Sequence, residues 1–340
     1  MYIFLYHCGS VRVEKPGSVV AARWDRGGII VDRVFFQRTK QGYRSVRGEL
    51  VRRVQIALRD KGFSTGEIDG VFGIGTEAAL YSWQKAAGTQ PSGAVTASGW
   101  EQLLNAPIPC LRDRCLQITA DFEGHGFSKV IGNFDGAWLT WGIIGFTLRG
   151  GELVRVLNDV RLKCPLQLAE AFGPLARELS LVLDRDARAR EEWANAIAVG
   201  EGRYRLLPEW TAAFEKLGSF PEVQEIQIAA AGRFWVRAQL DAQALDLKTE
   251  RGLALCFDIA VQNGGVSRPA KERIKRRLER GDCHRECDRL LIIADVVAEL
   301  SVPPYVEDVR SRKRTLAAGE GTVHGIRYET RTWGVDEIAA

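Results

Sequence analysis

The sequence has few histidines and no long apolar run. Only 4 of its 340 residues are histidine, and no H-E-x-x-H motif occurs, which argues against a catalytic zinc ion. No run of about 18 apolar residues is present, so no segment is expected to span a membrane. We therefore expect no metal, no other cofactor and no membrane-spanning helix.

The cysteines are too few and too scattered to form a disulfide framework. There are 7 in the whole chain, an odd number spread over its full length. Cys283 and Cys287 enclose His284 and Glu286, but a second pair at zinc-finger spacing is missing. Free thiols on helical surfaces are the simpler interpretation of this group.

The N-terminus lacks the pattern of a secretory signal. Residues 1–8 are apolar, but no positively charged region precedes them and no small-residue cleavage site follows. The pattern favours a β-strand. If the substrate lies outside the cytoplasm, we expect the protein to reach it by another route.

The overall composition is that of an ordinary globular protein with two or three domains. Apolar residues make up 46% and charged residues 26% of the chain. The net charge of +4 and pI near 8.7 suit an anionic polymer. No patch interleaves aromatic and basic residues, so we do not expect a nucleic acid partner.

Three segments follow from the pattern along the chain, and together they predict a mainly α (α+β) protein. Residues 1–47 form a small β-rich segment of unknown role, 48–107 a three-helix unit, and 108–340 a larger helical domain. Short hairpins fit around 130–146 and 322–333. Apolar residues three and four apart predict further helices. These cover 153–160, 165–172, 175–183, 188–198, 226–245, 253–263 and 283–300.

The three-helix unit contains a characteristic set of residues: Val54–Leu58, Ile68–Gly73, Thr76–Leu80, Trp83, Gln84 and Gly93. In these residues it resembles the peptidoglycan-binding domain of bacterial wall hydrolases. Thr76 is expected to cap the second helix. Asp69 and Gly70 are expected to shape the loop, because Asp tolerates turns and Gly allows positive φ. The alternative is a helical linker that binds nothing.

Two carboxylates mark the candidate active site in residues 118–152. Glu123 and Asp135 flank a short glycine-containing segment. Glycosidic bond cleavage needs one protonated and one ionised carboxyl group on opposite sides of a cleft. An apolar helix end around Phe122 favours a protonated Glu123, and an open hairpin favours an ionised Asp135. The plainer alternative is an amphipathic helix followed by a buried hairpin.

The same stretch resembles the family 46 chitosanases of the lysozyme-like superfamily. Ile118-Thr119 precedes Glu123, and Asp135-Gly136 is followed by Thr140 and by Gly142 to Phe146. The resemblance implies a lysozyme-like fold, with Glu123 as general acid, Asp135 as general base and Thr140 positioning the attacking water. Carboxyl groups about 6.5–9.5 Å apart would invert the anomeric centre.

Further candidate site residues surround this pair. Trp138 and Trp141 are candidates for stacking on a sugar ring, with core packing as the alternative, and His125 is a candidate sugar contact. By resemblance, Glu152 binds the sugar, and a buried Asp258 joins an arginine behind the acid. Arg312 is the candidate arginine, with a surface salt bridge as the alternative.

These features together predict a wall hydrolase that cuts β-1,4 bonds of peptidoglycan glycan strands. The loop between Glu123 and Asp135 is shorter than in typical chitosanases, and a unit resembling a wall-binding domain precedes it, so peptidoglycan is favoured over chitosan. Ala137 stands where the chitosanases have a basic residue, which is a further departure from their pattern. A non-catalytic wall-binding protein and a lytic transglycosylase compete with this prediction. Synthesis in the cytoplasm and action in the periplasm or cell wall would require export, injection or lysis. A phage or secretion-system component and an immunity protein would be the partners.

Overall fold

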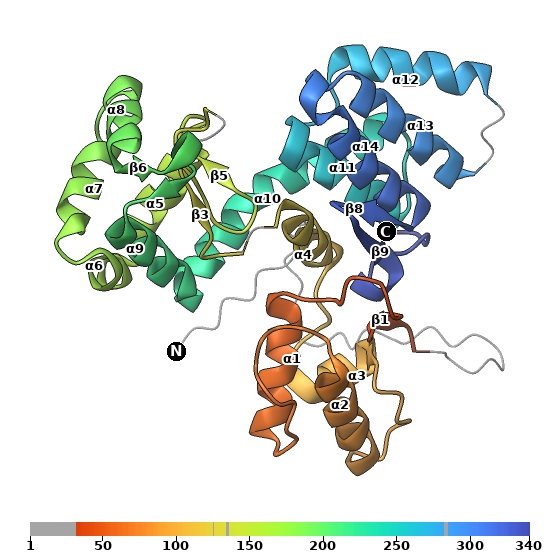
Figure 1. Ribbon diagram of the computed structural model, residues 1–340. Helices are drawn as coiled ribbons and strands as arrows, with labels where there is room; N and C mark the ends of the chain where they lie inside the picture. Colours follow the sequence, from red (N-terminus) through yellow and green to blue (C-terminus); the bar gives the residue numbers. More distant parts are fainter. Residues whose placement is uncertain (1–31, 125, 134–135, 282–284) are drawn as a thin grey trace, which may run out of the picture.

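The chain folds into a three-helix unit and a larger two-lobed body (Figure 1). The computed structural model describes residues 32–124, 126–133, 136–281 and 285–340. Fourteen α-helices and a few two- or three-stranded sheets make up these residues, which confirms the mainly α prediction. None of the described helices is long and apolar enough to cross a membrane.

The three-helix unit packs around a core of large apolar side chains that includes Phe72, Trp83 and Trp100. Its elements are β1 (Val34–Phe36), α1 (Glu49–Asp60), α2 (Ile74–Ala86), β2 (Val95–Thr96) and α3 (Ala97–Leu104). Strand β1 pairs antiparallel with β2, so residues 34–36, predicted as part of a separate segment, belong to this unit. The rest of the predicted segment, residues 1–31, lies outside the described residues.

The loop before α2 is held from within, as its sequence predicts. The Gln55 side chain donates to Asp69 and accepts from the Gly70 amide, and Gly70 has a φ of 71°. The prediction that Thr76 caps α2 is wrong. The helix begins two residues earlier, at Ile74, and the Thr76 hydroxyl bonds instead to the Val71 carbonyl oxygen.

The first lobe of the body combines a small sheet with short helices (yellow to green in Figure 1). Strands β3 (Val130–Ile131), β4 (Thr140–Trp141) and β5 (Phe146–Thr147) form an antiparallel sheet, as predicted for 130–146. The remaining elements are α5 (Glu152–Lys163), α6 (Pro165–Phe172), α7 (Leu175–Leu183), α8 (Ala187–Ile197), β6 (Ala198–Val199), a 3-10 turn (Glu201–Arg203), β7 (Arg205–Leu206) and α9 (Pro208–Ser219).

The second lobe is a helical bundle closed by a hairpin (blue in Figure 1). Its elements are α11 (Glu250–Asn263), α12 (Arg268–Arg280), α13 (Glu286–Glu299), α14 (Val306–Ala318), β8 (Glu320–Val323), β9 (Ile326–Glu329) and two 3-10 turns (Pro303–Tyr305, Thr330–Trp333). Helices α9, α12 and α14 were not predicted. Charged side chains obscure the apolar spacing in α12 and α14.

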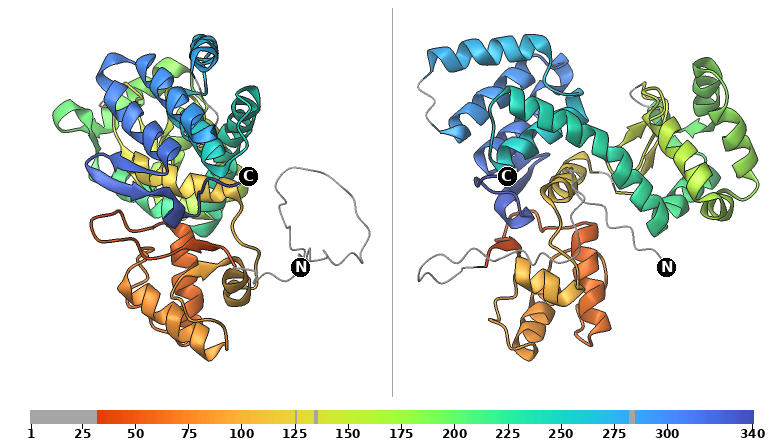
Figure 2. Two further views of the ribbon diagram at one scale, coloured as in Figure 1. Left: turned by 90° about the vertical axis from the view of Figure 1, so that its right-hand side faces the viewer. Right: turned by 180° about the vertical axis from the view of Figure 1, so that it is seen from behind.

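Two helices join the lobes. Helix α4 (Leu111–Glu123) is buried along most of its length, and α10 (Pro221–Ala244) contacts α5 and α9 of one lobe and α11 of the other. Figures 1 and 2 show α10 running across the molecule behind α4. Its 24 residues span about 36 Å. Gly232 lies near the midpoint of α10, where an added Cβ would meet no atom within 4 Å.

Ion pairs attach the three-helix unit to the body. Arg44 forms two hydrogen bonds of 2.8 Å with Asp121 on α4, and the Tyr328 hydroxyl donates to the same carboxylate at 2.6 Å. Farther along, Glu250 accepts from Arg33 and from Arg114. These contacts join segments far apart in sequence and fix the position of the unit beside α4.

Candidate active site

Glu123 is the last residue of α4 and lies where the two lobes meet. The helix ends there because Gly124 adopts the left-handed conformation, with a φ of 63°, that favours glycine. The Glu123 side chain is 22% exposed, so a ligand can reach the carboxylate. One oxygen lies 2.7 Å from Nη1 of Arg312. The surroundings of Glu123 are therefore less apolar than the sequence suggests.

Behind Glu123, a buried chain of charged groups fixes the arginine. Nη2 of Arg312 donates to Asp258 at 2.6 Å, and Nζ of Lys313 lies 2.5 Å from the other Asp258 oxygen. The Asp258 and Lys313 side chains are fully buried, and that of Arg312 is nearly so. The structure thus brings together the predicted residues Glu123, Asp258 and Arg312, and adds Lys313.

Charge balance allows this cluster to stay ionised inside the protein. Burial opposes the charged form of Asp258, but Arg312 and Lys313 outweigh burial and lower the pKa of that carboxyl. Burial lowers the pKa of Lys313 to about 8, although Asp258 acts in the opposite direction. Burial also disfavours the Arg312 charge, yet Asp258 and Glu123 raise its pKa. Arg312 is therefore a fixed positive charge beside Glu123.

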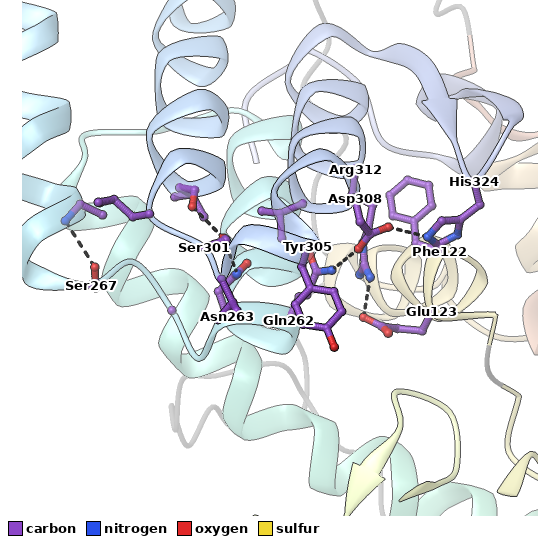
Figure 3. Close-up of a pocket in the computed structure, with 16 residues that line it drawn as sticks. Phe122, Glu123, Gln262, Asn263, Ser267, Ser301, Tyr305, Asp308, Arg312 and His324 are labelled. Carbon is purple, nitrogen blue, oxygen red and sulfur yellow. Dashed lines mark hydrogen bonds and ion pairs between the residues drawn. The ribbon is translucent and has the colours of Figure 1, made fainter. Parts of the chain in front are cut away.

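A pocket of about 740 Å³ opens beside Glu123 on the second lobe (Figure 3). Polar side chains line much of it. Asp308 accepts from Gln262 at 2.7 Å and is 2.5 Å from the His324 ring. Tyr305 is half-exposed at its rim. Hydrogen-bonding groups beside an aromatic face suit a ligand rich in hydroxyl and amide groups, such as a sugar.

On the hairpin side of the candidate site, the structure describes Trp138 and Thr140 but not every predicted residue. Asp135, the predicted base, and His125 lie outside the described residues. Thr140 lies in β4 and is 8% exposed. Trp138 is partly buried, and its backbone amide donates to the Asn133 side chain. The predicted roles of these residues stay predictions.

Trp141 is a core residue, so the prediction that it stacks on a sugar is wrong. Its side chain has no exposed surface. The indole Nε1 donates to the Phe214 carbonyl oxygen at 3.1 Å, and the two rings pack with centroids 5.7 Å apart. The core-packing alternative holds for this tryptophan.

Glu152 begins α5 and is held by its neighbours in the first lobe and α10. The carboxylate accepts from the Thr147 hydroxyl at 3.1 Å and from Arg155 at 3.3 Å, and Arg233 of α10 is 3.8 Å away. Its side chain is 27% exposed. The described partners of Glu152 therefore all belong to the first lobe or to α10. Its role in sugar binding stays a prediction.

Sequence reasoning missed Lys313 and the pocket residues Tyr305 and Asp308. Lys313 lies in a run of basic residues that has the appearance of a solvated helix face. The only signal for a second cation was the cost of burying Asp258 without balanced charge. Among the described residues, no group of three or more His, Cys, Asp or Glu side chains is arranged to hold a metal ion.

The three-helix unit can be compared directly with a known family. Residues 47–103 match the family model described as a putative peptidoglycan binding domain. This confirms the resemblance noted for the unit, which is the peptidoglycan-binding domain from here on. No curated protein sequence matches the chain.

Solved structures similar to the chain include two chitosanases. The native chitosanase of Bacillus subtilis MY002 is 20% identical, covers 61% of this chain and 84% of its own, and has a TM-score of 0.41. The GH46 chitosanase of Gynuella sunshinyii, in complex with chitotetraose, is 14% identical, covers 62% and 87%, and has a TM-score of 0.38. At this level of similarity, the function of the body has to be argued from its own residues.

Proposed function

We propose that this protein is a glycoside hydrolase that cleaves β-1,4 bonds in the glycan strands of bacterial peptidoglycan. The observation that carries the proposal is Glu123, a reachable carboxyl group at the edge of a polar pocket, held by an arginine that a buried aspartate fixes in turn. The peptidoglycan-binding domain supports the choice of polymer.

In the proposed reaction, Glu123 is the general acid. Its proton passes to the glycosidic oxygen as the bond to the anomeric carbon breaks, and a water molecule adds to that carbon from the opposite face. Asp135 takes the proton of the water, and the product has the inverted configuration. Arg312, itself bound to Asp258, holds the Glu123 carboxyl group at the edge of the pocket.

The first test replaces the acid. Glu123→Gln keeps the shape but cannot supply the proton, so we expect the release of new reducing ends from purified peptidoglycan to fall by about 10²–10⁴-fold. Glu101→Gln, at an exposed position on α3, is the matched control and should keep wild-type activity. Wild-type activity in the Glu123→Gln protein would eliminate the proposed acid.

Product analysis separates hydrolysis from transglycosylation and from binding alone. Incubating the wild-type protein with peptidoglycan and with chitosan side by side, followed by mass spectrometry, identifies the polymer that is cut. Anhydro-sugar products would indicate a lytic transglycosylase, and an absence of products from both polymers would indicate a non-catalytic binder. Early-time NMR of the new anomeric proton tests inversion. Delivery to the wall by export, injection or lysis is a separate proposal.

A further inference from the structure

A second cavity of about 740 Å³ lies between the peptidoglycan-binding domain and the body. On one side it is lined by α1 and the loop at residues 69–71, and on the other by α4, the start of α10 and residues 126–127. Figures 1 and 2 show α1 directly beside α4 in both orientations. Its volume is within the range of about 300–1,000 Å³ typical of ligand sites.

A buried amide in the lining of this cavity has an unused donor. Gln117 of α4 is 7% exposed, and its Oε1 accepts from the Leu50 amide of α1 at 3.1 Å. Its Nε2 has no hydrogen-bond partner among the described residues. This side chain therefore joins α4 to α1 at the wall of the cavity, while its Nε2 lies beneath the accessible surface.

The cavity also carries charges of both signs that form few close ion pairs within the described part of the protein. The Arg53 guanidinium lies 5.5 Å from the centre of the Trp100 ring, forms no salt bridge with a described carboxylate, and acts on Glu49 at longer range. Glu225, across the cavity on α10, likewise has no described ion-pair partner. Glu49 on α1 is close enough to interact with Glu225, and its nearest described cation, Arg52, is 3.9 Å away.

We propose that this cavity binds the peptide part of the wall polymer, as a short peptide bearing both ammonium and carboxylate groups. Glu49 and Glu225 would pair with the ammonium group, and Arg53 with a carboxylate. An uncharged glycan would leave these charges unpaired, and a polycation such as chitosan would leave Arg53 without a partner. The proposal rests on the proposed function in taking peptidoglycan as the substrate.

The position of the cavity relates peptide binding to the candidate acid. Asp121 lines the cavity, and Glu123 lies two residues farther along α4, at the edge of the first pocket. Residues two apart on a helix point in nearly opposite directions. The end of α4 therefore separates a peptide site from a sugar site, and one polymer could occupy both.

The test measures peptide binding without hydrolysis. Isothermal titration calorimetry would use the full chain carrying Glu123→Gln and a purified, sugar-free wall peptide that contains a diamino acid. We expect saturable binding to one site. Adding Arg53→Gln and Glu225→Gln, both at exposed positions, should weaken the affinity at least tenfold. The matched pair Arg59→Gln and Glu222→Gln, on the same two helices but outside the lining, should change it less than twofold.

Each contrary outcome overturns the proposal. These are no saturable binding, equal affinity in the cavity and control pairs, or preferential binding of a peptide-free glycan oligosaccharide that the cavity pair weakens. Because binding is measured in a protein without the candidate acid, failure here would leave the hydrolysis proposal intact. If the wild-type protein showed no hydrolysis of peptidoglycan, the proposal of peptide binding would likewise be unaffected.

Discussion

At the scale of single residues, Asp258 is the group on which the ionic cluster depends. It is the only described carboxylate in contact with both Arg312 and Lys313, and all three side chains are buried. Removing one partner from a buried ion pair leaves uncompensated charge, which costs far more than losing a surface pair. Arg312 in turn holds Glu123, so a change at Asp258 reaches the candidate acid through one intermediate residue.

Asp258→Asn should therefore destabilise the protein by about 3–5 kcal/mol. Asparagine preserves the shape but leaves the buried Lys313 without a carboxylate partner, and leaves Arg312 with Glu123 alone. Urea denaturation measures the change. Asp295→Asn, which affects a partly exposed pair with Arg314, is the control and should cost less than about 1 kcal/mol. Equal denaturation midpoints for the two variants would contradict this account of the cluster.

The pH dependence of stability provides a second readout on the same variant. The pKa of Asp258 is lowered in the folded protein, so the unfolded chain takes up its proton first as the pH falls. The stabilisation by Asp258 is therefore complete well above about pH 4 and is lost toward lower pH. The Asp258→Asn protein should lose less stability than the wild type between about pH 6 and pH 3.

Sequence analysis identified site residues that lie in recognisable motifs. It missed residues whose role depends on their burial in the folded protein. Glu123, Asp258 and Arg312 were predicted, and they form one cluster. Lys313 was missed because a lysine in a basic run is normally solvated. For Trp141, sugar stacking and core packing were both left open, because the pattern around it does not distinguish a buried indole from an exposed one.

At the scale of elements, the side chain of Gln227 attaches the hairpin to α10. Its Oε1 accepts from the Ile143 amide at 2.9 Å, and its Nε2 donates to the Phe127 carbonyl oxygen at 3.0 Å. Gly142 makes this approach possible, because a Cβ there would collide with the Gln227 oxygen. The segment between Glu123 and the sheet is thus positioned by a helix about a hundred residues away.

Gln227→Leu should loosen this attachment. Leucine fills a similar volume but leaves the Ile143 amide and the Phe127 carbonyl without partners, at a cost of about 1–3 kcal/mol. Amide hydrogen exchange should become faster at Ile143, and wall hydrolysis should fall. Gln243→Leu, exposed near the end of the same helix, is the control. Unchanged exchange at Ile143 would show that Gln227 does not hold the hairpin.

The helices were predicted where apolar spacing was regular and missed where charge interrupts it. Helix α10 was expected over 226–245 and runs over Pro221–Ala244. Helix α14 was not expected, since its buried face includes the charged residues Arg312 and Lys313. The spacing of apolar residues identifies a helix that buries an apolar face. A helix that buries charged residues in ion pairs does not show this spacing.

At the scale of the whole molecule, Asp121 joins three parts of the chain. Arg44 lies between β1 and α1 of the peptidoglycan-binding domain, Asp121 is on α4, and Tyr328 belongs to β9. Burial and the hydrogen bond to Asp121 raise the pKa of Tyr328, so its hydroxyl remains a donor at neutral pH. We expect this contact to couple the unfolding of the domain to that of the body.

Asp121→Ala should uncouple them. We expect differential scanning calorimetry to show two thermal transitions in the variant and one in the wild type, because Arg44 and Tyr328 lose their shared partner. Asp159→Ala, in an exposed pair with Lys163 on α5, should keep one transition. A single transition at the wild-type temperature in Asp121→Ala would mean that other contacts join the two parts.

The order of the parts could be predicted from the sequence, but their contacts could not. The three-helix unit has its own core and a family pattern within 47–103. The pairs Arg44–Asp121 and Arg33–Glu250 join residues 77 and 217 positions apart. Nothing in a local pattern selects such partners among the many charged residues of the chain.

Helix α10 is a single long helix that contacts both lobes of the body, with Gly232 near its centre. Its arms on either side of Gly232 are each about 18 Å long, so a bend of about 10° at the centre would move the far ends by about 3 Å. Glycine in a helix interior is less favourable than alanine by about 0.5–1 kcal/mol, and no neighbouring atom would prevent a side chain there. A change of curvature at this position would therefore alter the separation of the two lobes.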